Sequence, residues 1–417
     1  MPKAFVQSVG TGTRQDQDIT RPLVWHWRRS GAGFTVWVVS EQSRAHAERM
    51  AHALELSPAQ YRIEMVSDTD NVEAVYRDCL ALLRDLGQQG FEPDMIEVDY
   101  TSGTKAMTAG LVLAAVAHRC GTLSYISGER HGGVVASDTE RVVSIEPRRI
   151  WADERLRLAG EYCRALRFDA ALTLLDSVKP VWLGDYERRL AAGLRLIGTG
   201  YGAWDRFEYG RASGELRKLR ESAVPDLDPF RPEQSVLTRL VALTPANGFS
   251  ADRLADLYNN AGRRLDEGRC DDALARLYRL TEMLAQWILH GQYGIDTADV
   301  DLAKAPTPLQ AQLAARRSAE GKILIGLDLD YQLLKALDHP VGRHFDEGEW
   351  RGIGVLLKKR NVSLLAHGLE PVSKKDLESL RDKLQALVAL EVPDFVDRRR
   401  ALEFPWRRGR EVASGAG

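Results

Sequence analysis

The sequence predicts an α/β, Rossmann-like N-terminal domain followed by an all-α middle domain and an all-α C-terminal domain. Up to about residue 147, short β-prone runs alternate with amphipathic segments, which is typical of a mainly parallel sheet covered by helices. After Pro147 only helical patterns follow. The 417 residues suffice for two or three domains, and we place these at 1–149, 150–246 and 247–412.

Strands in the N-terminal part are expected where β-branched, aromatic and other apolar residues run together between turn residues. In chain order these runs are 4–9, 34–39, 61–66, 95–99, 123–126 and 142–145. Apolar residues three or four positions apart predict helices between the strands. These helices are 44–54, 71–86 and 106–119.

The rest of the chain repeats the helical spacing, and breaks rich in Pro, Gly or Asp separate its segments. The predicted helices are 152–166, 169–175, 185–196, 212–221, 250–266, 271–289, 309–318, 331–337, 348–367 and 374–390. The runs 224–233 and 245–248 predict linkers between groups of helices.

The composition excludes several classes of protein. Hydrophobic residues make up 44% and charged residues 28%, which is incompatible with a disordered or collagen-like chain. The 57 Lys and Arg residues and 59 Asp and Glu residues leave a net charge of −2, which argues against a protein that coats nucleic acid without specificity. A local basic site is still compatible with this balance.

The cysteines and the apolar segments predict a cytoplasmic protein. Cys79, Cys120, Cys163 and Cys270 lie far apart and form no C-x-x-C motif, so we expect neither disulfides nor a metal site. No long apolar region follows the initiating methionine, and the most apolar stretch, 107–117, is shorter than the roughly 20 residues that span a bilayer.

Three polar turns form the first candidate site. They are Gly10-Thr11-Gly12-Thr13, Ser40-Glu41-Gln42-Ser43 and Thr101-Ser102-Gly103-Thr104-Lys105, and each follows a predicted strand. Because the carboxyl ends of parallel strands meet at one edge of a sheet, we expect the turns to line a ligand site there. Lys105, the N–H groups that open the following helix, and the hydroxyls of Thr11, Ser102 and Thr104 would suit phosphate or ribose. The alternative is that each turn only caps a helix.

Two familiar phosphate-binding motifs are absent. A Walker loop requires Gly-Lys-Ser/Thr, but here Thr104 separates Gly103 from Lys105, and Ala106 follows. A dinucleotide fingerprint requires a third glycine where Gln15 stands. A typical nucleotide hydrolase or NAD enzyme is therefore disfavoured.

The second candidate site lies on the predicted helix 348–367. Arg360 and His367 are seven residues apart, about 20° short of two helical turns, so they share one face. An arginine can neutralise charge on a phosphorane, and a histidine can move a proton to or from a ribose hydroxyl. Since seven residues rise about 10 Å, one helix cannot bring both groups to one phosphate, and a twofold dimer could. Taken alone, such a pair is more often a solvated helix face.

Together these segments resemble a known family, the CRISPR-associated CARF–HEPN ribonucleases of type III systems. The three turns look like the ligand-facing segments of a CARF domain. The residues Arg360 and Asn361, followed by His367 after a spacing at the long end of the family range, are similar to the HEPN motif. The segments 256–264 and 272–280 look like the helices that precede that motif.

The resemblance implies an endoribonuclease of type III CRISPR antiviral defence that a cyclic oligoadenylate activates. It assigns 1–149 to the CARF sensor, 150–246 to a helical linker domain and 247–412 to the HEPN domain. Arg360 and His367 would be catalytic and Asn361 would orient them, in a homodimer that cuts single-stranded RNA without a metal or cofactor and leaves a 2′,3′-cyclic phosphate. The residues expected to hold the activator are Gly10, Thr11, Gly12, Thr13, Ser40, Gln42, Ser43, Thr101, Ser102, Gly103, Thr104 and Lys105.

Partners and alternatives complete the prediction. We expect no membrane association and no stable complex with the CRISPR effector. Arg130 is either a further activator contact or a surface residue, and the basic runs 398–400 and 406–410 are either an RNA-entry surface or solvated faces. Ring size and a second, activator-degrading activity stay open. The competing functions are a CARF-type sensor or scaffold without nuclease activity and a nucleotide-dependent enzyme built on the first domain.

Overall fold

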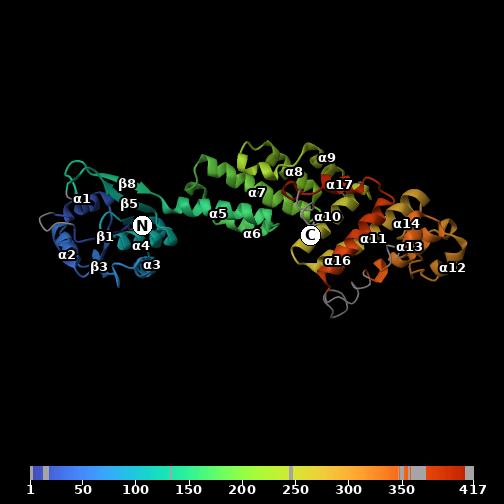
Figure 1. Ribbon diagram of the computed structural model, residues 1–417, viewed down its shortest axis with the longest axis horizontal. Coiled ribbons are helices and arrows are strands. Elements are labelled where there is room, and N and C mark those ends of the chain that lie inside the picture. The colour runs from blue at the N-terminus through green and yellow to red at the C-terminus, as the bar shows by residue number, and fades with distance from the viewer. Residues whose placement is uncertain are drawn as a thin grey trace. The chain divides into compact units, whose positions relative to one another are not determined.

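A computed structural model describes residues 3–12, 18–131, 134–243, 248–345, 347, 352–355, 357 and 372–408. The chain forms two compact units, shown in Figure 1. The N-terminal unit consists of 1–158 with 174–188, and the helical unit consists of 159–173 with 189–417. The division into three domains stays a prediction.

The N-terminal unit is built on a six-stranded sheet with the order β3-β2-β1-β4-β5-β8. The strands are β1 Ala4–Val9, β2 Phe34–Val39, β3 Tyr61–Met65, β4 Ile96–Asp99, β5 Thr122–Ser127 and β8 Arg141–Ile145. The first five are parallel, and β8 pairs antiparallel with β5. A separate two-stranded hairpin joins β6 Arg130–His131 to β7 Val134–Val135. The predicted mainly parallel, Rossmann-like sheet is confirmed.

Both faces of this sheet are buried, because successive side chains along each strand point to opposite faces. Val36 and Val38 pack with helices α3 (Val72–Gln88) and α4 (Lys105–His118) in one core. Trp37 and Val39 point the other way and pack with α1 (Thr20–Ser30) and α2 (Arg44–Ala53). Because consecutive residues of a strand face opposite sides, one continuous apolar run supplies both cores.

Helix α1 was not among the predicted helices, although its ends carry recognisable signals. Pro22 lies in its first turn, and Gly31 ends it with a left-handed φ of 66°. Its buried residues Leu23 and His26 follow helical spacing. The helical spacing was not recognised because the segment contains aromatic and β-branched residues, which favour strands.

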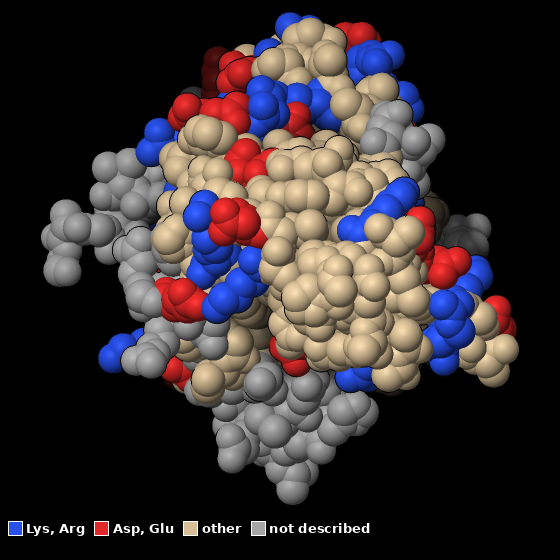
Figure 2. Space-filling view, turned by 90° about the vertical axis from the view of Figure 1, so that its right-hand side faces the viewer, with Lys and Arg blue, Asp and Glu red and all other residues tan. Residues whose placement is uncertain are grey.

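The helical unit confirms that helices replace strands after Pro147. In the part that the structure describes, the elements after the sheet are α5 Pro147–Arg164, α6 Phe168–Asp176, η2 Pro180–Trp182, α7 Asp185–Asp205, α8 Tyr209–Glu221, η3 Pro225–Phe230, α9 Gln234–Ala242, α10 Ala251–Asp266, α11 Cys270–Tyr293, η5 Leu302–Lys304, α12 Thr307–Ala314, α13 Leu327–Ala336, α14 Pro340–His344, α16 Lys374–Ala389, α17 Phe395–Ala401 and η7 Pro405–Arg407. A 3₁₀ helix, η1, covers Pro93–Met95 before β4. Figure 2 views the side on which α12 and α13 lie.

The expected linker 224–233 is instead a packed segment. It forms η3, in which Leu227 and Phe230 are buried. The Tyr201 hydroxyl donates to the Phe230 carbonyl at 2.6 Å, and Trp406 packs against the Phe230 ring. Pro and Asp therefore shape a short 3₁₀ helix here, and apolar residues between them anchor it to the core of the helical unit.

Buried charges fasten α10 to its surroundings in the helical unit. The fully buried Arg263 lies 2.7 Å from Asp205, and Arg264 contacts the same carboxylate. Asp256 accepts from the indole of Trp204 at 2.7 Å and from the hydroxyl of Tyr209 at 2.8 Å. Burial raises the pKa of Asp256 to about 6 despite the opposing charge of Arg263. These contacts fix the register of the helix that begins the C-terminal helical group.

Candidate functional site

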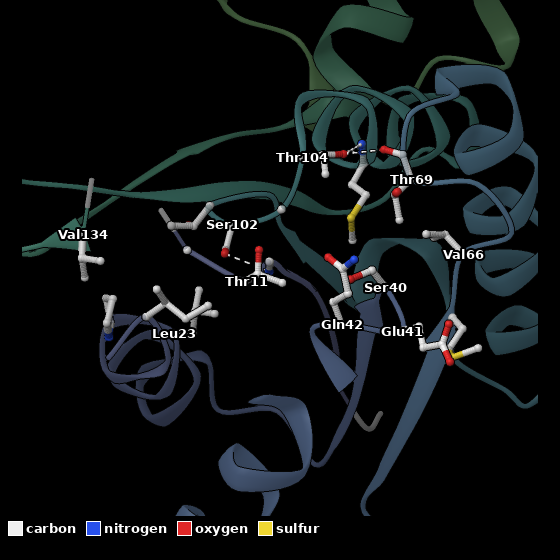
Figure 3. A pocket seen from close by; sticks show the side chains of 18 of the residues that line it. Thr11, Leu23, Ser40, Glu41, Gln42, Val66, Thr69, Ser102, Thr104 and Val134 are labelled. Carbon is white, nitrogen blue, oxygen red and sulfur yellow. Dashed lines mark hydrogen bonds between the residues drawn. The ribbon is translucent and has the colours of Figure 1, made fainter. Parts of the chain in front are cut away.

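A cavity of about 850 Å³ opens at the carboxyl edge of the sheet in the N-terminal unit (Figure 3). Its lining includes nine of the predicted residues, namely Gly10, Thr11, Gly12, Ser40, Gln42, Thr101, Ser102, Gly103 and Thr104. Ser43 and Lys105 do not line it, and Thr13 lies outside the described residues. The three turns therefore meet at one cavity, as expected for the edge where the strand order reverses.

The turns after β1 and β4 approach each other closely at two glycines. A Cβ atom on Gly10 would lie 2.7 Å from the Gly103 nitrogen, so only glycine fits. Gly103 itself has a φ of 121°, which strains any other residue. The Gly10 N–H donates to the Ser102 hydroxyl at 3.0 Å, and the Ser8 hydroxyl donates to the Ser102 carbonyl. Backbone contact thus holds the two turns as one rigid floor.

The hydroxyls at the cavity differ in what they can offer a ligand. Ser102 accepts from Gly10, so its own proton is available. Thr11 is exposed and makes no hydrogen bond within the described part of the chain. Thr104 donates to the Thr69 carbonyl at 2.6 Å and accepts from the Met107 N–H at 3.1 Å. Its hydroxyl therefore caps α4 and binds the loop after β3, and its proton is not available to a ligand.

The turn after β2 divides into an inner and an outer part. Ser43 is buried, accepts from the Ser40 N–H at 2.9 Å and donates its own N–H to the Ser40 hydroxyl at 3.1 Å. It therefore shapes the turn from beneath. Glu41 and Gln42 are exposed and face the cavity, as Figure 3 shows. Lys105 is exposed at the first residue of α4, away from the lining.

Sequence reasoning missed three contributors to the lining. The loop after β3 adds Ser67, Asp68 and Thr69, and the same rule about strand ends could have found it. Asp78 fastens this loop by accepting from the Ser67 N–H and hydroxyl at 2.7 and 2.8 Å. Helix α1 and the β6–β7 hairpin add apolar residues, among them Leu23. The hairpin also brings Arg130, the open candidate, to the lining.

A buried charged network lies directly under the cavity floor. The His26 ring contacts Asp99 at 2.8 Å through Nδ1 and Glu97 at 3.2 Å through Nε2. Asp99 also accepts from the Gln7 amide at 2.7 Å and from the Thr101 N–H at 2.8 Å. The network therefore ties α1 and β1 to the turn that carries Thr101, and no sequence pattern indicated it.

The pKa values of His26 and Glu97 make both side chains charged near neutral pH. Burial opposes the charge on His26, yet hydrogen bonds to Asp99 and Glu97 and their negative charge raise its pKa to about 9. Burial alone would raise the pKa of Glu97, but hydrogen bonds from His26, Lys3 and Ser124 lower it to about 2. A cationic ring between two carboxylates is the arrangement that low dielectric favours.

The cavity lining itself carries few charges. Glu41 and Asp68 lie at the ends of β2 and β3, and Arg130 is the cationic residue of the described lining. A bound anion would therefore meet hydroxyls and the N–H groups at the start of α4 more than basic side chains. The carboxylates can accept hydrogen bonds from amino groups.

The second candidate site lies outside the described residues, which contain none of Arg360, Asn361 and His367. Most of the predicted helix 348–367 is likewise outside them. In the part described, no group of three metal-ligating side chains and no helix long and apolar enough to cross a membrane is found.

Comparisons with known proteins match both parts of the chain. The family model described as the Csm6 HEPN domain matches residues 247–391. The structure of Enterococcus italicus Csm6 bound to cyclic hexa-2′-fluoro-hexa-dAMP is similar at a TM-score of 0.63 and 13% identity, over 98% of this chain and all of that one. At that identity the likeness concerns the fold.

A second solved structure is less similar. Can2 from Sulfobacillus thermosulfidooxidans in complex with cyclic tetra-adenylate has a TM-score of 0.24 and 13% identity, over 71% of this chain and 70% of that one. No curated protein matches the sequence.

Proposed function

Since this chain belongs to the CARF–HEPN family of type III CRISPR effectors, we propose that it is an endoribonuclease activated by a cyclic oligoadenylate. The activator would bind the cavity of the N-terminal unit, and the HEPN domain would cut single-stranded RNA. The observation that carries this proposal is the convergence of three predicted turns on one cavity at the strand ends.

The chemistry of the cavity supports a nucleotide ligand. The free proton of Ser102 and the hydroxyl of Thr11 suit phosphate or ribose oxygens. Glu41 and Asp68 can accept hydrogen bonds from the amino group of adenine. The apolar side chain of Leu23 offers a surface for a base. A ring of several adenylates presents all three kinds of group.

The cleavage step is proposed for Arg360, Asn361 and His367 of a homodimer. The 2′-oxygen of the ribose would attack phosphorus, and the bond from phosphorus to the 5′-oxygen would break. His367 would move the proton from the attacking hydroxyl or to the leaving oxygen, and Arg360 would neutralise the phosphorane. Asn361 would orient the pair. The products are a 2′,3′-cyclic phosphate and a 5′-hydroxyl, and no metal takes part.

Activation is proposed to be a shift between two arrangements of the dimer. A ring that binds the competent arrangement more tightly would multiply the equilibrium constant between the two arrangements by up to the ratio of its two affinities. In reverse, RNA held at the HEPN site would tighten ring binding by the factor by which the ring tightens RNA binding.

One assay tests the proposal. Labelled single-stranded RNA is mixed with the protein in EDTA, with cyclic tetra-adenylate, with cyclic hexa-adenylate or with neither. We expect cutting only with a ring, retained in EDTA, and lost in Arg360→Ala and in His367→Ala. Cutting that needs magnesium would contradict the mechanism. Ring binding without any cutting would favour a sensor or scaffold.

A further inference from the structure

Three arginines of the C-terminal basic runs, Arg398, Arg407 and Arg408, form ion pairs within the helical unit. Arg398 lies 2.8 Å from Asp252 and 2.9 Å from Asp394. Arg407 pairs with Asp266, and Arg408 pairs with Glu233. These arginines fasten the C-terminal segment to the helices. Because carboxylates neutralise their charges within the protein, these arginines would attract an RNA strand only weakly.

A short hairpin between α12 and α13 carries three basic residues, Arg316, Arg317 and Lys322. We call residues 316–322 the basic hairpin. Arg317 pairs with Ile323 across a β-bridge, the Ser318 N–H donates to the Lys322 carbonyl at 2.7 Å, and the Arg317 guanidinium donates to the Gly321 carbonyl at 2.6 Å.

The charges of the basic hairpin point to solvent. Arg316, Arg317 and Lys322 are exposed, and none forms an ion pair with a carboxylate in the described part of the helical unit. Against Glu320 they leave an excess of positive charge. Exposed cations without carboxylate partners are the side chains that attract phosphates.

A pocket of about 280 Å³ adjoins the basic hairpin. Arg316 lines it together with Tyr278 of α11, the exposed carboxylate Asp328 of α13, and Leu324, which is 64% exposed. Its lining also includes Gly354 and Leu357, which stand six and three positions before Arg360 in the chain. On the side that carries α12 and α13, Figure 2 shows a broad area without charged side chains, with Lys, Arg, Asp and Glu around it.

We infer that this pocket and the basic hairpin bind a nucleotide of the single-stranded RNA substrate. An aromatic ring and an exposed leucine offer a surface on which a base stacks, and the cations at the rim take the phosphates on either side. Because Leu357 of the lining stands only three positions before Arg360 in the sequence, we assign the bound nucleotide to the strand that enters the proposed cleavage site. The inference rests on the proposed function.

The test compares two pairs of exposed cations. Arg316→Gln with Lys322→Gln removes charge at the hairpin and spares Arg317, whose guanidinium holds the hairpin closed. Arg217→Gln with Arg220→Gln on α8 is the matched control, since both are exposed and without ion pairs in the described chain. Affinity for a fluorescein-labelled single-stranded RNA is measured by anisotropy in a His367→Ala background, over a series of salt concentrations.

We expect the hairpin variant to bind RNA roughly tenfold more weakly and the control to bind normally. The slope of log affinity against log salt should flatten by about 0.7 for each phosphate that the variant no longer neutralises. Tyr278→Leu, which keeps an apolar side chain but removes the ring, should weaken binding about fivefold with an unchanged slope. With His367 intact, the hairpin variant should raise KM and leave kcat nearly unchanged.

Two results would overturn the inference. One is a hairpin variant that binds and cleaves RNA as the control does, while wild type cuts RNA, which would leave the proposed function standing. The other is a change of mass in sedimentation without a change of RNA affinity, which would make the surface a contact between subunits. A wild-type protein that cuts no RNA with any ring would instead refute the proposed function, and this inference with it.

Discussion

His26 is a cation in the interior because two carboxylates face its ring. Its Nδ1 lies 2.8 Å from Asp99 and its Nε2 lies 3.2 Å from Glu97. Asp99 in turn holds the Thr101 N–H at 2.8 Å, so the charge of one residue orders the floor of the cavity. Removing one member of such a group leaves buried charge without a partner, which is the costly case.

Replacing His26 should therefore destabilise the protein and change its pH dependence. His26→Gln should lower the free energy of unfolding by about 3 kcal/mol at neutral pH. The folded pKa of His26, about 9, exceeds its ordinary value of 6.5. The stabilisation is thus complete below pH 6.5 and is lost as the pH rises through 9.

Urea unfolding of the full chain between these pH values checks the prediction. Wild type should lose stability toward alkaline pH, and His26→Gln should show a flatter profile. His52→Gln, which changes an exposed histidine on α2, is the control. Equal profiles for the two variants would show that the His26 charge contributes nothing.

At the scale of elements, the contact between the turns after β1 and β4 determines the cavity floor. Gly10 and Gly103 bring two backbones together, and Ser102 joins them through its hydroxyl. The loop after β3 is tied in by Thr104, which donates to the Thr69 carbonyl. The loops after β1, β3 and β4 thus form one surface, and its shape depends on the close contact between the backbones at Gly10 and Gly103. A side chain added at either glycine would therefore displace all three loops.

Gly10→Ala should impair activator binding. The added Cβ would meet the Gly103 backbone at 2.7 Å, and backbone atoms cannot swing aside as a flexible side chain can. We expect affinity for a cyclic oligoadenylate, measured by calorimetry, to fall roughly tenfold or more, because the phosphate-facing groups separate.

Gly33→Ala provides the comparison for this experiment, since nothing lies within 4 Å of its added methyl group. It should bind the ring normally. If Gly10→Ala bound the ring as tightly as Gly33→Ala, the cavity at the strand ends would not be the activator site.

At the scale of the whole molecule, the proposed activity separates sensing from cutting. The cavity belongs to the N-terminal unit, and the match to the Csm6 HEPN domain covers residues 247–391. A ring of identical nucleotides is rotationally symmetric, and so is a homodimer, which lets two equal cavities share one ring.

Calorimetry should accordingly find one ring bound for every two chains, and sedimentation should find a dimer in the presence of the ring. Arg360→Ala should keep this stoichiometry, because its position lies in the HEPN domain. One ring for each chain, or a monomer that still cuts RNA, would contradict the shared arrangement.

The sequence by itself determined most of the strands and helices and three of the turns that meet at the cavity, but not α1, the β6–β7 hairpin or the loop after β3. Strand runs such as Phe34–Val39 are mostly apolar, and polar turns follow them, so local pattern alone places Ser40 and Thr101 at strand ends. The helices after Pro147 follow from spacing in the same way. These features depend on residues a few positions apart.

Only the tertiary structure decided how polar groups are paired. His26 meets Asp99 from 73 residues away, and Arg408 meets Glu233 from 175 residues away. The hydroxyl of Thr104 donates to the carbonyl of Thr69, which stands 35 residues earlier in the chain. Burial and partner choice depend on which distant segments pack together, because charge and hydrogen bonding act through space, and no local spacing records that.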